Sequence, residues 1–508
     1  MYEKTIEQWG MFEWSGKGKS SGNPFADVTI RGRFQGPGED VTTEGFYDGD
    51  GVYKIRFMPR NQGHYTFQIG GDFSDESFAG EFDVTAPGEG NHGPVSVCNT
   101  YCLQYADGTP YYSIGTTCYV WELQSDALIE KTLQNLEKAG FNKIRFCIFP
   151  KHYDYNLREP RSYPYEGTPM DSSVLTRENF QEYTGKTEGN HWDFYRFNPA
   201  HFRHIEDCIR KLSAIGVEAD IIVFHPYDRW GFSSMSRAED TFYMKYLINR
   251  LSAFRNVWWA MANEYDLFEE KNAADWDYIG NYFMEHDPYQ HLRSIHNCHE
   301  FFDHSKPWIT HVSAQRIDIY RTVENTDEIR KTYQKPVIWD EISYEGNIQF
   351  GWGNITGEEM VRRFWEASMR GAYPGHGETY YNEEDILWWS HGGDLHGESH
   401  KRFAFLHRIL CETPGNGLKI DTSRRDGWDC ALAMPADEDL AEKTGYRIYY
   451  FSFMRPSLRD FTWADDTSYR VEVIDTWNMT ITDAGVHRGT FRIQLPGRPY
   501  IAVRIRKA

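Results

Sequence analysis

The sequence lacks two features of membrane and secreted proteins. It contains no run of about 18 apolar residues, and its start (residues 1–12) does not have the pattern of a signal peptide. Its eight cysteines are scattered and none belongs to a C-x-x-C pair, so they do not build a disulfide framework. We therefore expect no membrane partner, reduced thiols and a cytoplasmic location.

Positive charge is also scarce. Lysine and arginine number 54 against 75 aspartates and glutamates, which gives a net charge of −21. This excess repels nucleic acid and anionic membranes, so we expect neither as a partner and a neutral ligand instead. Aromatic residues, in contrast, make up 16% of the chain. Their faces stack on the C–H faces of sugars and also fill the cores of β-domains, so the composition favours a carbohydrate-binding protein.

The pattern along the chain divides it into three parts, as its 508 residues suggest. Residues 1–90 alternate apolar and polar positions between glycine and aspartate turns, which predicts a β-sandwich. The step from Gly63 to Tyr65 resembles the corner tyrosine of immunoglobulin-like sandwiches. Residues 96–412 alternate strands with helices. Residues 413–508 return to strands alone and predict a C-terminal β-sandwich.

The middle part predicts an α/β fold, a (β/α)8 barrel of the TIM type. The eight expected strands are 109–121, 141–149, 217–224, 257–262, 292–297, 308–315, 335–341 and 376–381. Capping signals begin several of the helices between them, at Ser125, at Asn198-Pro199 and at Thr356 with Glu359. Residues 150–197 are too long for a simple connection and are expected to serve function.

Two of these strands end in a glutamate. The fourth runs into Asn263-Glu264 and the seventh into Asp340-Glu341. Most glutamates are surface acids, but these two follow nearly uncharged runs that contain tryptophan. Barrel enzymes keep their chemistry at the carboxyl ends of strands, and two acids held there suit glycoside hydrolysis. Glu264 and Glu341 are therefore the expected catalytic pair, whereas Asp340 has the opposite strand parity and is expected to face the helices as a structural residue.

Further polar and aromatic residues follow the expected strand ends. Four histidines indicate either sugar ligands or a metal site: His225, His296, His311 and His376. The first strand lacks the H-x-H pattern of hydrolytic metal barrels, so no metal is expected. The other candidate sugar contacts are Tyr227, Gln315, Tyr344, Trp121, Trp388 and Trp389, with Trp230 and Trp352 as additional aromatic residues of the rim. Glu345 and Glu378 are the rival acids.

The acids at the ends of the fourth and seventh strands resemble those of the large clan of retaining glycosidases on (β/α)8 barrels. The leading β-domain, the barrel and the short β-tail resemble the apiosidase-like glycosidases within it. The resemblance implies that Glu264 is the acid/base, that Asn263 binds the sugar 2-hydroxyl and that Glu341 is the nucleophile. It also implies that Arg145 keeps the nucleophile ionised and that a tryptophan after strand eight stacks on sugar. Relatives that release apiose carry aspartate at the position of Glu264, so the resemblance does not assign the sugar.

The predicted function is a retaining, exo-acting glycoside hydrolase that acts on a plant-type or dietary oligosaccharide without a cofactor. One alternative is an endo-acting hydrolase of the cellulase or mannanase type. Another is a carbohydrate-binding protein without catalytic activity. The sugar, its linkage and the oligomeric state stay open, and a homo-oligomer is compatible with the sequence.

Overall fold

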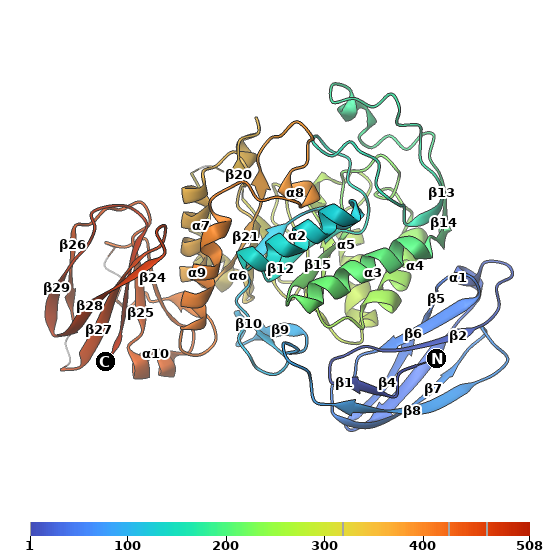
Figure 1. Ribbon diagram of the computed structural model, residues 1–508, viewed down its shortest axis with the longest axis horizontal. Coiled ribbons are helices and arrows are strands. Elements are labelled where there is room, and N and C mark those ends of the chain that lie inside the picture. The colour runs from blue at the N-terminus through green and yellow to red at the C-terminus, as the bar shows by residue number, and fades with distance from the viewer. Residues whose placement is uncertain (1, 317, 319, 425–426, 464–465) are drawn as a thin grey trace.

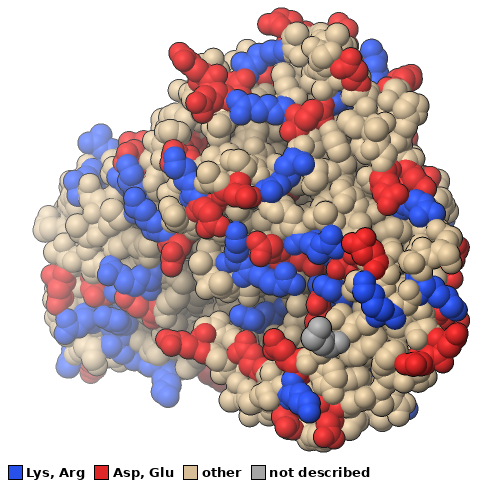
Figure 2. All heavy atoms as spheres, turned by 45° about the vertical axis from the view of Figure 1, so that its right-hand side comes forward, with Lys and Arg blue, Asp and Glu red and all other residues tan. Residues whose placement is uncertain are grey.

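The computed structural model describes residues 2–316, 318, 320–424, 427–463 and 466–508. A central α/β body carries one β unit on each side, the N-terminal unit in blue and the C-terminal unit in red (Figure 1). Within the described ranges, no helix combines the length and apolarity needed to cross a membrane. Figure 2 shows acidic and basic side chains interspersed over one face, so the net negative charge does not gather there into a single acidic patch.

The centre is an eight-stranded parallel sheet with the order β17-β16-β15-β12-β11-β21-β19-β18. Its strands are β11 (Gly115–Thr117), β12 (Lys143–Cys147), β15 (Glu218–Phe224), β16 (Val257–Ala262), β17 (Arg293–Ser294), β18 (Val312–Gln315), β19 (Val337–Glu341) and β21 (Tyr373–His376). The edge strands β17 and β18 approach each other, because the Thr310 amide donates to the Arg293 carbonyl over 2.9 Å. The sheet is therefore nearly closed, which confirms the predicted barrel.

The barrel helices begin and end close to the predicted signals. They are α2 (Asp126–Ala139), α3 (Pro199–Ala214), α4 (Arg237–Leu251), α5 (Ala273–His286), α6 (Thr326–Tyr333), α7 (Gly357–Met369), the short α8 (Trp388–His391) and α9 (His400–Cys411). Ser125 caps α2, and Gly140 ends it in the left-handed conformation at φ 76°. The capping box predicted at Thr356 is half formed. The Thr356 side chain accepts from the Glu359 amide, whereas the Glu359 carboxylate binds arginines of α7.

The eighth barrel strand differs from the prediction. It is β21, and the residues after it form β22 (Glu378–Thr379), which pairs with β20 (Glu345–Gly346) outside the barrel. Gly375 lets β21 approach β19, since a Cβ there would lie 2.5 Å from the Asp340 carbonyl oxygen. The long connection 150–197 holds a hairpin of β13 (Tyr165–Thr168) and β14 (His191–Phe197).

The N-terminal unit is a sandwich of two sheets, with the orders β1-β8-β7-β3-β4 and β2-β6-β5. Its elements are β1 (Thr5–Glu7), β2 (Phe12–Lys17), α1 (Pro24–Asp27), β3 (Arg31–Gly36), β4 (Glu39–Glu44), β5 (Phe46–Tyr47), β6 (Val52–Phe57), β7 (Gly63–Gly70) and β8 (Phe78–Thr85). The Tyr65 hydroxyl donates to the Asn61 carbonyl over 3.0 Å, the contact expected of a corner tyrosine. A hairpin of β9 (Val95–Cys98) and β10 (Cys102–Tyr105) leads into the barrel.

The C-terminal unit also has two sheets, with the orders β23-β24-β25-β30-β27-β28 and β26-β29. Its elements are β23 (Leu418–Ile420), β24 (Ala431–Pro435), α10 (Glu438–Thr444), β25 (Arg447–Tyr450), β26 (Leu458–Thr462), β27 (Ser468–Asp475), β28 (Thr480–Arg488), β29 (Thr490–Gln494) and β30 (Ile501–Lys507).

A buried ionic network joins the N-terminal sandwich to the barrel. Glu206 of α3 pairs with Arg56 of β6 over 2.8 Å and with Arg250 of α4 over 2.6 Å. Arg250 also pairs with Asp48, over 2.8 Å. Burial alone would raise the pKa of Glu206, but the two arginines lower it to about 2. The carboxylate is therefore ionised and lies between two buried cations.

Replacing Glu206 by Gln is expected to lower the free energy of unfolding by about 3–5 kcal/mol, because two buried guanidinium groups lose their counter-charge. Guanidinium unfolding measures the change. Since the pKa of Glu206 is depressed, this contribution is complete above the unfolded pKa of about 4.3 and is lost as the pH falls towards 2. Glu130→Gln removes an exposed partner of Lys211 and serves as the control. Equal destabilisation by both variants would contradict the role of the network.

Candidate active site

A cavity of about 270 Å³ opens at the carboxyl ends of the barrel strands. Both predicted acids, Glu264 and Glu341, line it. The remaining lining residues are Tyr119, Lys151, Tyr153, Tyr227, Leu267, Cys298, Gln315, Ser343, Tyr344, Trp352 and Trp389. Segments that follow at least six barrel strands thus contribute to one small space, which is the usual position of a barrel active site.

Glu264 directly follows β16 in a strained backbone conformation. Its φ is 49°, in the left-handed region that residues other than glycine rarely adopt. The carboxylate accepts hydrogen bonds from the Gln315 amide over 2.9 Å, from the Asn263 amide over 3.1 Å and from the Tyr227 hydroxyl. Strain of this kind concentrates at functional sites, where the surroundings hold a side chain in one direction.

Glu341, at the end of β19, lies among positive and donor groups. Its Oε1 atom is 3.6 Å from Arg145 Nη1 and 3.4 Å from His296 Nε2, and it accepts a hydrogen bond from the Tyr119 hydroxyl. Burial alone would raise the pKa of Glu341, but His296, Arg145 and Tyr119 lower it to about 2. The carboxylate is therefore ionised at neutral pH.

Asn263 connects the surroundings of the two acids. Its side-chain oxygen accepts from Arg145 Nη1 over 2.6 Å and lies 3.3 Å from the Tyr119 hydroxyl. Its amide nitrogen donates to Glu264. Because an arginine only donates, this contact fixes which end of the amide faces which acid. One buried side chain thus ties the group that holds Glu341 ionised to the carboxylate of Glu264.

Asp340 does not face the helices as predicted. It accepts from Lys143 Nζ over 2.6 Å inside the barrel, whereas the Trp339 indole points outward to Thr326 of α6. The register of β18 against β19 shifts at this point, so that Asp340 is skipped and Glu341 is paired. Such a bulge reverses the side-chain alternation, and the parity argument was therefore wrong.

Besides His376, four predicted contacts lie outside the cavity. His225 binds the Phe149 carbonyl over 3.2 Å. His311 packs in the barrel interior, and Trp121 and Trp388 are buried in the main core. Burial lowers the pKa of His225 and of His311 to about 3. These side chains are neutral packing groups, and the rim position inferred from the strand ends does not bring them to the site.

The rival acids also lie outside the cavity. Glu345 accepts from the Glu398 amide over 2.7 Å and from the Ser399 amide over 3.0 Å. Glu378 accepts from the Gly397 amide over 2.9 Å. Both carboxylates therefore hold the turn that precedes α9. His376 lies beside them and does not contact the cavity.

The remaining predicted contacts are at the site. Tyr227, Gln315, Tyr344 and Trp389 line the cavity, while Asn263, Arg145 and His296 surround the acids. Trp389 packs against Trp352 at a centroid distance of 5.3 Å and forms an aromatic wall with it. The sequence analysis missed Tyr119, Lys151, Tyr153, Leu267, Cys298 and Ser343. The strand-end rule that found Glu264 applies equally to Tyr119, which follows β11.

Comparison with known proteins places this geometry in a family. A family model described as "Apiosidase-like, catalytic domain" matches residues 98–443. The chain belongs to the apiosidase-like family. Two models described as domains of unknown function match residues 5–72 and 428–506, on either side of it. The predicted family resemblance is thereby confirmed.

Solved structures agree with the assignment. The apiosidase-like chain is 35% identical to a candidate glycoside hydrolase from Bacteroides vulgatus ATCC 8482, with 100% of both chains covered and a TM-score of 0.90. It shares the fold of a glycoside hydrolase family 5 protein from the same organism, at 14% identity and a TM-score of 0.61, with 82% of this chain and 93% of the other covered. A comparison with curated proteins gave no match. The protein is a glycoside hydrolase.

Proposed function

We propose that the protein is a retaining glycosidase with Glu341 as the nucleophile and Glu264 as the acid/base. One observation carries the proposal: the two acids share a cavity but have different partners. Arg145 and His296 hold Glu341 as a carboxylate, whereas Glu264 has amide and phenol groups as its hydrogen-bond partners. A nucleophile must be ionised and a proton donor must carry its proton, so the two groups need different environments.

The reaction then follows from the positions of these groups. Glu264 donates a proton to the leaving oxygen while Glu341 attacks the anomeric carbon and forms a glycosyl-enzyme. In the second step Glu264 takes a proton from water, and the oxygen of that water displaces Glu341 from the sugar. This chemistry requires carboxyl groups about 5–5.5 Å apart. The single Asn263 side chain that bridges their surroundings supports such a spacing.

The size of the cavity favours exo action on a short oligosaccharide. At about 270 Å³ it is slightly smaller than the range of about 300–1,000 Å³ in which drug-sized ligands bind. Trp389, Trp352 and Tyr153 close it with aromatic rings, and Tyr153 belongs to the long connection 150–197. An endo-acting enzyme needs a groove that passes a polymer. Faster hydrolysis of a polysaccharide than of aryl glycosides would contradict exo action.

Replacing Glu341 or Glu264 by Gln is expected to lower kcat by about 100-fold or more, because each variant removes the nucleophile or the proton transfer. The assay uses a panel of aryl glycosides, and circular dichroism verifies the fold. Azide is expected to restore turnover to Glu264→Ala and to yield a glycosyl azide, since this anion attacks the glycosyl-enzyme without a general base.

Glu300→Gln, an exposed acid near the rim, provides the matched control and should retain the wild-type rate. Near-normal activity of Glu341→Gln or Glu264→Gln would remove that residue from its role. Sugar binding by wild type without turnover of any glycoside would favour a binding protein instead.

Replacing Arg145 by Met is expected to raise the pKa of Glu341 by about 1–3 units, because the carboxylate loses its nearest guanidinium group. The acid limb of the kcat/KM profile should then move up from near pH 2 into the range of pH 3–5, where it can be measured. His296→Gln should shift it in the same direction. Arg161→Met, which removes a partly exposed arginine bound to Asp126, is the control. An unchanged acid limb in both test variants would show that Arg145 and His296 do not set the ionisation of Glu341.

A further inference from the structure

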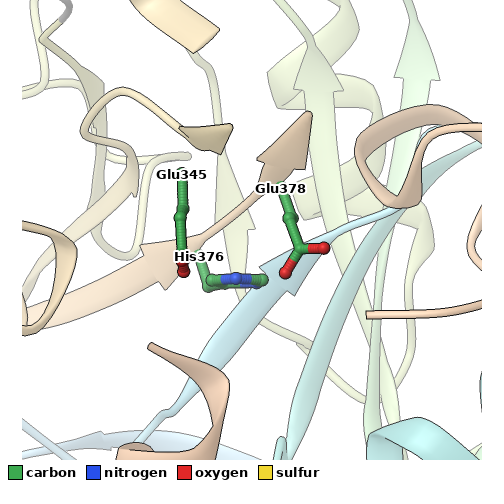
Figure 3. Close-up of side chains that lie close together, drawn as sticks. All are labelled: Glu345, His376 and Glu378. Carbon is green, nitrogen blue, oxygen red and sulfur yellow. The ribbon is translucent and has the colours of Figure 1, made fainter. Parts of the chain in front are cut away.

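We propose that Glu345, His376 and Glu378 bind a divalent transition-metal cation of the zinc type, in a site separate from the active-site cavity. Each residue offers one ligand atom, and the three atoms lie within 4.8 Å of one another. Figure 3 shows Glu345 and Glu378 on either side of the His376 ring. All three side chains are at most 1% exposed, so water cannot solvate the charges they carry.

His376 has a free ligand position. Its Nδ1 atom lies 3.0 Å from the Thr116 hydroxyl oxygen, while its Nε2 atom has no hydrogen-bond partner among the described residues. If Nδ1 donates to Thr116, the lone pair of Nε2 is available. Histidines that bind metals usually donate their other ring N–H to an oxygen in this way, which fixes the tautomer and the direction of the ring.

The two carboxylates lack a cation. In the described part of the chain, neither Glu345 nor Glu378 forms an ion pair with a lysine or arginine. Two buried carboxyl groups this close are unfavourable as a pair of anions, and a divalent cation would neutralise both. Of the donors among the described residues, Glu378 accepts only the amides of residues 396 and 397 and keeps a lone pair on each oxygen for the metal. Glu345 also accepts from the Tyr380 and Ser399 hydroxyls, and the metal would have to displace one of these donors.

His400, at the start of α9, lies next to this group of three and would complete the site by a movement of its side chain. Its Nδ1 atom lies 3.9 Å from Glu378 Oε2 and also has no hydrogen-bond partner among the residues described. Its side chain is 14% exposed and provides a path from solvent. Two carboxylates and two imidazoles in a four-coordinate arrangement suit zinc better than calcium or magnesium, which prefer oxygen ligands alone.

The cation would have a structural role. It would join β20, β21, β22 and the start of α9. Tyr344 directly precedes β20, and Trp389 lies in the chain between β22 and α9, so these segments adjoin two residues that line the cavity. None of its ligands lines the cavity. The sequence analysis expected no metal because the first strand lacks H-x-H. That pattern concerns a catalytic ion at the mouth of the barrel, whereas these ligands lie outside the active-site cavity.

The test begins with wild-type protein that has been stripped with a chelator and dialysed. Titration with ZnCl2, followed by elemental analysis, is expected to give one zinc per chain, and zinc should raise the Tm. Cobalt(II) in its place should show the visible absorption of a four-coordinate ion. If wild type binds no zinc and its Tm does not change, the carboxyl groups share a proton instead and the proposal is wrong.

Glu378→Gln and His400→Gln are expected to weaken zinc binding by about tenfold or more. Glu398→Gln, an exposed acid of the same turn, is the matched control and should bind as wild type does. Zinc that stays bound with the wild-type affinity in both test variants is a surface ion, which would also overturn the proposal. If Glu378→Gln does not fold, His400→Gln and the wild-type titration decide.

A second observation concerns the active-site cavity and rests on the function proposed for it. We infer that Lys151 selects a sugar that carries a carboxylate, as in a uronic acid. The Lys151 ammonium lies 3.6 Å from the centre of the Tyr119 ring and 4.0 Å from that of Tyr227. Within the described residues it forms neither a hydrogen bond nor an ion pair, although it lines the cavity beside both acids. Among the described residues, the nearest groups to the ammonium are ring faces.

The charges of the cavity favour an anionic substrate. When Glu264 carries its proton, Arg145 and Lys151 face the single carboxylate Glu341. Burial lowers the pKa of Lys151 to about 8, and Glu264 partly opposes this, so most of the lysine is still charged at pH 7. Glu264 and Glu341 are the carboxyl groups that act on the ammonium, and a neutral sugar would bring it no further counter-charge. The local charge thus differs from the net charge of −21, which alone suggests a neutral ligand.

The test uses pairs of 4-nitrophenyl glycosides that differ only at carbon 6, such as glucoside with glucuronide and galactoside with galacturonide, in both anomers. Wild type is expected to favour the uronide of the pair it hydrolyses by about tenfold or more in kcat/KM, and Lys151→Met should abolish this preference. A preference for the neutral member, or one that survives in Lys151→Met, would overturn this inference and leave the glycosidase proposal intact. If wild type hydrolyses neither member of any pair, the proposed function fails as well.

Discussion

The site depends on keeping a carboxylate ionised in the dry interior of a barrel. Burial opposes the charge of Glu341, and the pKa falls only because Arg145, His296 and Tyr119 are held against it. Burial would also lower the pKa of Arg145, and the Asp340 and Asp220 carboxylates are among the charges that raise it. Lys143 lies between Asp220 and Asp340 at 2.7 Å and 2.6 Å. A parallel barrel can carry so many buried charges because alternate strands contribute the inward side chains of each layer, so opposite charges from different strands meet.

The sequence predicted the fold and the two acids for the same physical reason. Parallel strands are buried on both faces, so they appear as continuous apolar runs whose ends are sharp. The end of such a run is the rim of the barrel, and Glu264 and Glu341 stand there. This signal lies within each strand, so it can be read from the sequence without knowing which strands pair. The capping signals of the helices, such as Ser125 and Gly140, are local in the same way.

The features that could not be predicted depend on pairing between distant segments. The bulge that turns Asp340 inward arises where β18 meets β19, and neither strand shows it alone. The choice between Trp388 and Trp389 is similar. Both belong to α8, where successive side chains point about 100° apart, and only the packing of that turn decides which one reaches the cavity. Lys151 was missed because a lysine after a strand has no local mark that separates a buried ammonium from an exposed one.

The leading sandwich has a consequence for how the protein is inherited. Arg56 of that unit and Arg250 of the barrel both pair with the Glu206 carboxylate, so the interface between the two units depends on charges from both sides. In a fragment that contains the barrel alone, Glu206 would lose Arg56, Arg250 would lose Asp48, and both side chains would become exposed to solvent. Recombination that exchanges the N-terminal sandwich must therefore also change the barrel residues that pair with it. We expect the sandwich and the barrel to be inherited together.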